Sequence, residues 1–173
     1  MQHSMRRLAR VFAKLARFTL YIAGTCLVLM TIVVAAQVAS RYLLGTSLIW
    51  SEPMAVQMMG WFIFLGAAVG TREGYHLSFD ILLMVLPAKA VSWCNSLSDF
   101  FVGAFGFGMF WYGAELVVRT WGSKMPSLGI PEGTNFLPLV FGGMLVFLYS
   151  GERLLRRASG LQTVRFGEEL IED

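Results

Sequence analysis

Residues 54–71 read MAVQMMGWFIFLGAAVGT, a run of eighteen residues without a charged side chain. At about 1.5 Å rise per residue, a helix of this length covers roughly 27 Å, which is enough to cross the hydrocarbon core of a bilayer with little tilt. Polar and charged residues flank the run on both sides, at 41–53 and 72–87. The stretch 41–87 therefore predicts a membrane span with a loop at each end.

The composition of the whole chain agrees with a membrane protein. Of its 173 residues, 56% are hydrophobic and 14% are charged, whereas an ordinary soluble domain has about 25% charged residues. A soluble protein of this size would lack the polar surface to cover such a core. The net charge of +3 is modest, so the excess of basic residues is poor evidence for nucleic acid binding. The sequence predicts an all-α integral membrane protein.

Four apolar runs are long enough to be membrane spans. The first has no charged side chain and exceeds the apolar core of a signal peptide, so we expect it to remain uncleaved. In the third, Glu115 and Arg119 are four residues apart and are expected to pair on one helix face. Asp99 is expected at the boundary of this span, because a carboxylate in mid-membrane would cost roughly 3 kcal/mol and would need a partner. The four spans are expected at residues 18–40, 54–71, 99–120 and 134–151.

The segments outside the spans carry most of the basic residues. In residues 1–17, five Lys/Arg recur at spacings of three and four, which predicts an amphipathic helix with one basic face. Such a segment either rests on an anionic inner leaflet or is a solvated tail that only sets the topology. Eleven of the fourteen Lys/Arg precede the first span, separate the second from the third, or follow the fourth. The positive-inside rule therefore places both termini, including the tail 152–173, in the cytoplasm.

The sequence offers no recognisable catalytic, cofactor or metal site. His3 and His76 are the only histidines, and neither lies in an apolar run, which excludes a two-histidine haem site between spans. Cys26 and Cys94 lack the spacing of metal ligands. Phosphate-loop and dinucleotide-binding patterns are also missing. We therefore expect neither an enzyme nor a cofactor.

Small residues inside the spans are typical of close helix packing, because they let two backbones approach each other. The candidates are Gly66 and Gly70 in the second span and Gly103 and Gly106 in the third. A solute path usually shows intramembrane acids, bases or broken helices, but the first, second and fourth spans contain no charged residue. The chain therefore has packing surfaces without a path of its own, which is typical of an accessory subunit.

Two other classes of protein remain open. A self-sufficient homodimeric exporter of four spans would need an essential acid deep in a span, and Asp99 is the residue available for this role. An Asp99→Asn substitution separates the two classes, since an accessory subunit predicts a mild effect on uptake by the full system. The second alternative is a membrane-anchor subunit of an enzyme complex, for which haem or flavin absorption by the purified protein would be the evidence.

The flanks of the central span resemble those of a known family. The matching positions are Arg41-Tyr42, Trp50-Ser51-Glu52, Arg72, Gly74, His76, Asp80, Leu86-Pro87, residues 127–131 and Pro138. In this order on a four-span chain, they are similar to the small membrane subunit, of the DctQ type, of tripartite ATP-independent periplasmic (TRAP) transporters. The resemblance covers roughly residues 18–157. Pro53 departs from the pattern, because the family often has a second acid at this position.

This resemblance implies a multi-pass protein of the bacterial inner membrane that pairs with a large permease subunit. The large subunit is expected to move an organic acid by a sodium-coupled, elevator-like mechanism, after a periplasmic binding protein has delivered it. The small subunit is expected to brace the static scaffold of the large one. Nothing in the sequence identifies the solute.

The same resemblance implies two groups of contact residues, one on each side of the membrane. Arg41, Trp50 and Glu52 on the outer loop are candidates for partner contact or interface anchoring. Arg72, His76 and Asp80 are candidates for ordering the cytoplasmic turn between the second and third spans.

Overall fold

The computed structural model describes residues 2–73 and 88–158, and the regular elements within these residues are all helices. They are α1 (Gln2–Leu43), α2 (Ser51–Glu73), α4 (Ala88–Thr120), the short 3-10 helix η1 (Glu132–Phe136) and α5 (Leu137–Ala158). Each of the four α-helices is long and apolar enough to cross a membrane. The prediction of an all-α chain with four spans is confirmed.

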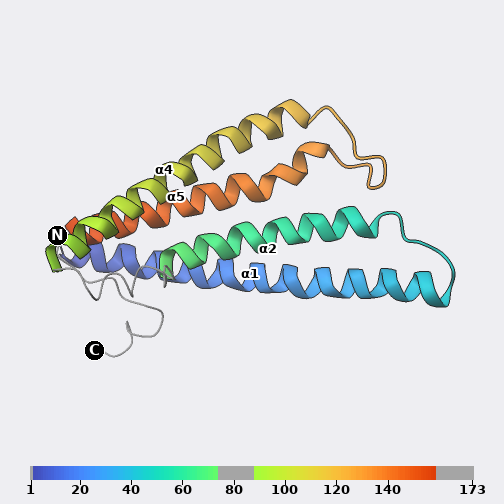
Figure 1. The fold of residues 1–173 in the computed structure, drawn as a ribbon, viewed down its shortest axis with the longest axis horizontal. Helices are drawn as coiled ribbons and strands as arrows, with labels where there is room; N and C mark the ends of the chain where they lie inside the picture. Colours follow the sequence, from blue (N-terminus) through green and yellow to red (C-terminus); the bar gives the residue numbers. More distant parts are fainter. Residues whose placement is uncertain (1, 74–87, 159–173) are drawn as a thin grey trace.

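The four helices lie side by side in the order α1, α2, α5, α4 (Figure 1). α2 packs on α1 and α5, and α5 packs on α2 and α4, so that α1 and α4 form the two edges of an open layer. The pairs α1/α2 and α4/α5 lie close together at the end where α1 begins. They spread apart toward the opposite end, which carries the α1–α2 loop and the loop between α4 and η1 (Figure 1).

The helices extend beyond the spans expected from the sequence. α1 runs without a break through the basic segment 1–17 and the expected span 18–40, α4 begins well before Asp99, and α5 continues to Ala158. No proline interrupts the additional turns. The charged residues there are mostly Arg and Lys, which are good helix formers and therefore continue a helix beyond its apolar part.

The loop between α4 and η1 is ordered by hydrogen bonds within its own backbone. The N–H of Met125 donates to the carbonyl of Ile130 at 2.9 Å, and the N–H of Glu132 donates to that of Ser123 at 2.8 Å. Gly129 has a φ of +67°, a left-handed conformation that residues with a side chain rarely adopt. The loop therefore closes on itself before the chain enters η1.

The hydrophobic core lies where the helices converge. An edge-to-face contact joins the rings of Phe12 in α1 and Tyr149 in α5, whose centroids are 6.0 Å apart. Around this contact, small residues of α1 meet larger residues of its neighbours, and the buried members are Ala16 and Ala23 of α1, Leu65 and Ala68 of α2, and Leu145, Val146 and Tyr149 of α5. The core thus holds α1, α2 and α5 together beside the C-terminal ends of α2 and α5. Both of these ends carry charged side chains.

Candidate functional site

Five charged side chains from three helices meet beside this core. Asp99 is 1% exposed, Glu152 is 5%, Arg72 is 7% and Arg153 is 9% exposed, and the Glu73 side chain is 6% exposed. We call these five residues the ion cluster. Burying an isolated charge is costly, so charges at this depth require mutual pairing.

Arg153 of α5 joins three helices. Its Nε lies 3.3 Å from Oδ1 of Asp99 in α4, and its Nη1 donates a 2.6 Å hydrogen bond to the carbonyl oxygen of Thr71 in α2. Thr71 belongs to the last turn of α2, where carbonyls lack an intrahelical partner and the helix dipole favours a cation. Arg153 therefore neutralises the buried carboxylate of Asp99 in α4 and donates to a carbonyl at the C-terminal end of α2.

A second contact between α2 and α5 is made by Arg72 and Glu152. Nε of Arg72 lies 3.6 Å from Oε2 of Glu152, and its Nη1 lies 3.4 Å from Oε1 of the adjacent Glu73. Glu152 and Arg153 are consecutive in α5, and together they make two contacts with α2 and one with α4. The cluster fixes the relative placement of three spans, since removing one partner of a buried pair costs about 3–5 kcal/mol.

The contact between α4 and α5 is made by glycines. A Cβ at Gly106 would lie 2.8 Å from the backbone nitrogen of Phe147, and a Cβ at Gly143 would lie 2.8 Å from the carbonyl oxygen of Gly106. Only a hydrogen atom fits at either position, so the two backbones touch. One turn away, a Cβ at Gly103 would lie 3.3 Å from Cβ of Ser150. The two glycines of α4 proposed from the sequence for helix packing, Gly103 and Gly106, thus face α5.

The glycines Gly66 and Gly70 of α2 have a different position. No other part of the described chain comes within 4 Å of a Cβ placed at either residue. α2 meets α5 instead at Gly142, where a Cβ would lie 2.6 Å from Cβ of Phe64. Gly66 and Gly70 therefore lie on a face of α2 that none of the described helices covers.

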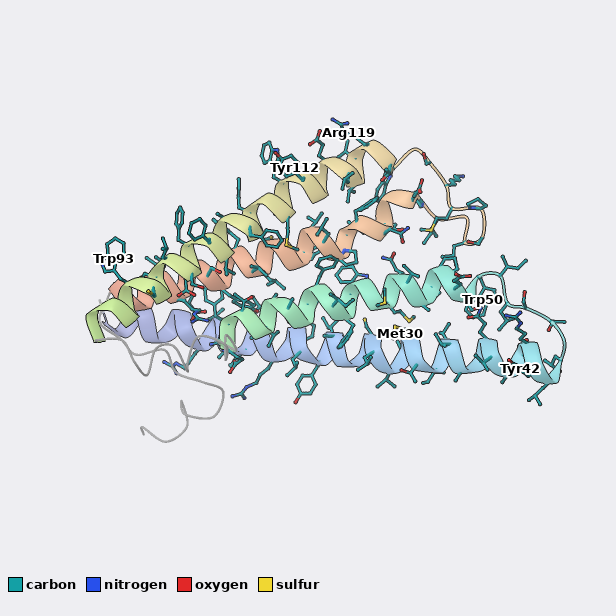
Figure 2. The ribbon with its side chains drawn as sticks, viewed as in Figure 1. Met30, Tyr42, Trp50, Trp93, Tyr112 and Arg119 are labelled. Carbon is teal, nitrogen blue, oxygen red and sulfur yellow. The ribbon has the colours of Figure 1, made fainter. Side chains whose placement is uncertain are left out.

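The residues proposed for partner contact lie at the opposite end from the ion cluster. Arg41 and Glu52 are exposed, and Trp50 is 44% exposed. Figure 2 shows Trp50 near the beginning of α2, close to the end of α1 that carries Tyr42. Among the described residues, no ion pair joins Arg41 to Glu52. They share one end of the molecule without forming a joint site.

Of the three residues proposed for the cytoplasmic turn, the structure describes Arg72, which belongs to the ion cluster. His76 and Asp80 lie outside the described residues.

The roles of Glu152 and Arg153 were not predicted from the sequence, in which both belong to the tail 152–173 that follows the last span. The available signal was Asp99, because an acid beside an apolar run needs a partner if it is buried. Asp99 is buried and its partner is Arg153. Choosing this arginine from the sequence would have required the order of the helices, which the apolar pattern does not contain.

Four long apolar helices packed in one layer define a helical multi-pass membrane protein. The chain belongs to the family described as the DctQ component of tripartite ATP-independent periplasmic transporters, whose family model matches residues 30–160. It is thus a transporter component and a multi-pass protein of the bacterial inner membrane, and this family fits a protein that is not an enzyme.

Three relatives support this assignment. The C4-dicarboxylate TRAP transporter small permease protein DctQ of Vibrio cholerae is 26% identical over 116 residues, which are 62% of this chain and 48% of the relative. A putative TRAP transporter small permease protein of Haemophilus influenzae is 25% identical over 123 residues, 69% of this chain and 74% of the relative. The sialic acid TRAP transporter permease protein SiaT of Haemophilus influenzae is 28% identical over 82 residues, 47% of this chain and 13% of that protein. The chain thus matches about half the length of the Vibrio protein.

Proposed function

We propose that this chain is the small permease subunit of a TRAP transporter and that it braces the static scaffold of a large permease subunit. The observation that carries this proposal is the ion cluster, in which Arg153 links α5 to α2 and α4 through buried contacts. Among the other residues whose side-chain burial the structure describes, no charged residue is buried. The described spans therefore offer a rigid unit and no second set of charges for a solute path.

The surroundings of Asp99 argue against a self-sufficient exporter. An exporter would need this carboxylate to face a path through the membrane. Asp99 is instead 1% exposed and lies against the guanidinium of Arg153. An acid held in this way supports a structural role in an accessory subunit.

The orientation that we propose has both termini in the cytoplasm. The beginning of α1 and the end of α5 lie at the same end of the layer (Figure 1), and the basic residues of the sequence are concentrated there. In this orientation, the ion cluster lies at the cytoplasmic ends of the spans. The loops that follow α1 and α4 then face the periplasm.

In this proposal, the large subunit and a periplasmic binding protein supply the transport chemistry. The large subunit couples an elevator-like movement to sodium, and the solute is an organic acid. The names of two relatives mention C4-dicarboxylate and sialic acid, both of which carry carboxyl groups, and this supports the solute class. We assign contact with the binding protein to Arg41, Trp50 and Glu52, because exposed charges and an amphipathic ring suit a polar protein interface.

We assign contact with the large subunit to the α4 edge of the layer. The exposed rings of Phe101, Phe105 and Tyr112 follow one face of α4, and Figure 2 shows Tyr112 projecting away from α5. Ala104 and Gly108 lie between these rings and leave holes that a partner helix can fill. Aromatic side chains are also enriched at protein interfaces. The α1 edge differs, because it exposes mainly aliphatic side chains: Leu27, Val28, Leu29, Ile32, Val34 and Val38.

A leucine at Gly108 is expected to weaken the association with the large subunit by about tenfold, because it overfills one of these holes. Nothing in the described chain lies within 4 Å of a Cβ at this position, so the fold of the small subunit should be retained. The measurement is co-purification of a tagged large subunit from detergent-solubilised membranes, together with thermal melting of the isolated small subunit.

Gly24 on the α1 edge provides the matched control. It also has open space around a Cβ, and Gly24→Leu is expected to leave co-purification close to the wild-type level. If the two variants co-purified equally well, or if both lost the large subunit, the assignment of the α4 edge would be wrong.

A further inference from the structure

We propose that Arg10, Lys14 and Arg17 of α1 form a binding site for the headgroup of an anionic phospholipid. All three are exposed, and their spacings of four and three place them on one face of the helix. α1 contains no acidic residue over its whole length. We call these three residues the basic stripe, and α1 itself contributes no carboxylate to it.

At the level of the basic stripe, α1 stands upright within the layer. Ala16, Thr19 and Ala23 on the opposite side are 0%, 4% and 1% exposed, and the two alanines belong to the core shared with α2 and α5. A helix resting on the leaflet would bury its apolar side in lipid. Here that side is packed against the protein's own helices, and the stripe faces outward from a helix that continues into the membrane without a break.

The same face of α1 changes from basic to apolar within one turn. Tyr21, Val28 and Ile32 continue the stripe and are 76%, 58% and 57% exposed. One turn, about 6 Å, separates Arg17 from Tyr21, and a tyrosine suits the boundary between headgroups and acyl chains. A phospholipid has the matching order, an anionic phosphate followed by an acyl chain. An acidic protein surface would match only the basic half of this face.

The test uses the purified full-length protein in a neutral detergent, titrated with dioleoylphosphatidylglycerol and followed by native mass spectrometry. The double variant Arg10→Gln/Lys14→Gln is expected to raise the apparent Kd about tenfold or more, because each Lys or Arg near an anionic surface contributes a factor of about five. Dioleoylphosphatidylcholine is expected to bind the wild type more weakly than the anionic lipid. Inorganic phosphate at the same concentration is expected not to displace the lipid.

The control variant Arg119→Gln/Lys124→Gln removes two exposed positive charges from the other end of the molecule and is expected to leave the Kd near the wild-type value. An equal loss in both variants, or no loss in the first, overturns the proposal. Displacement by inorganic phosphate also overturns it, since the stripe would then be a site for free anions. Unchanged lipid affinity with loss of a co-purified large subunit would instead make the stripe a protein contact. If the double variant does not fold, Lys14→Gln alone, with an expected change of about fivefold, decides.

Discussion

Replacing Arg153 by methionine is expected to lower the free energy of unfolding by about 3–5 kcal/mol. The substitution removes both the ion pair with Asp99 and the hydrogen bond to the carbonyl oxygen of Thr71. It takes the guanidinium partner from a buried carboxylate, and this loss is more costly than that of a surface pair. Unfolding by sodium dodecyl sulfate in mixed micelles measures the change.

Arg119→Met is the matched control, because Arg119 also pairs with an acid of α4. Its pair with Glu115, predicted from their spacing, is confirmed, and the two side chains are 72% and 43% exposed. The control is expected to change the free energy of unfolding by only about 0–1 kcal/mol. Equal losses in Arg153→Met and Arg119→Met would contradict a structural role for the ion cluster.

A double-mutant cycle separates the buried pair from the other contacts of Arg153. The double variant Asp99→Asn/Arg153→Met is expected to be more stable than the sum of the two single changes predicts, because the second substitution no longer leaves a buried charge without its partner. The structure also changes the expectation for Asp99→Asn, for which the sequence predicted a mild effect on uptake. Since Asp99 is buried against Arg153, the amount of folded subunit should fall, while uptake per folded complex is retained.

Gly106→Ala is expected to lower the free energy of unfolding by about 1–3 kcal/mol through overpacking. The new Cβ would lie 2.8 Å from the backbone nitrogen of Phe147 and 3.0 Å from the carbonyl oxygen of Gly143. Neither backbone atom can rotate away as a side chain can, so α4 and α5 must separate. The same unfolding titration measures the loss.

Gly108→Ala tests whether the effect comes from the contact or from the loss of a glycine in general. Gly108 lies two residues further along α4, with nothing of the described chain within 4 Å of a Cβ. Alanine has the higher helix propensity, by about 1 kcal/mol, so Gly108→Ala should be neutral or stabilising. If both alanine variants were equally stable, the backbone contact between α4 and α5 would be refuted.

The membrane spans could be predicted from the sequence because each depends on a local property, an apolar run of sufficient length. The ends of the helices could not, since helix formation continues into basic residues that no longer belong to the apolar run. α1 shows this directly, because the basic segment and the first span form one helix.

The ion cluster could not be predicted because it depends on which helices are neighbours. Consecutive membrane spans usually pack side by side, and this would place α4, the third span, next to α2. α5 lies between them instead, and this position brings Glu152 to Arg72 and Arg153 to Asp99.

Which glycines make close helix contacts also depends on which helices are neighbours. Gly106 and Gly66 both lie in apolar runs beside other small residues. From the sequence, both were therefore predicted to lie at close contacts between helices. A neighbouring backbone lies against Gly106 but not against Gly66. The spacing of small residues thus predicts which helix faces can pack closely, whereas the order of the helices decides which of them do.

Solute uptake by reconstituted vesicles tests the bracing role most directly. With a sodium gradient, vesicles that contain this chain, the large permease subunit and the binding protein are expected to accumulate an organic acid, with C4-dicarboxylate and sialic acid as the first solutes tested. Vesicles that contain this chain alone are expected to accumulate no more than empty vesicles. Accumulation of an organic acid against its gradient by this chain alone would contradict the account.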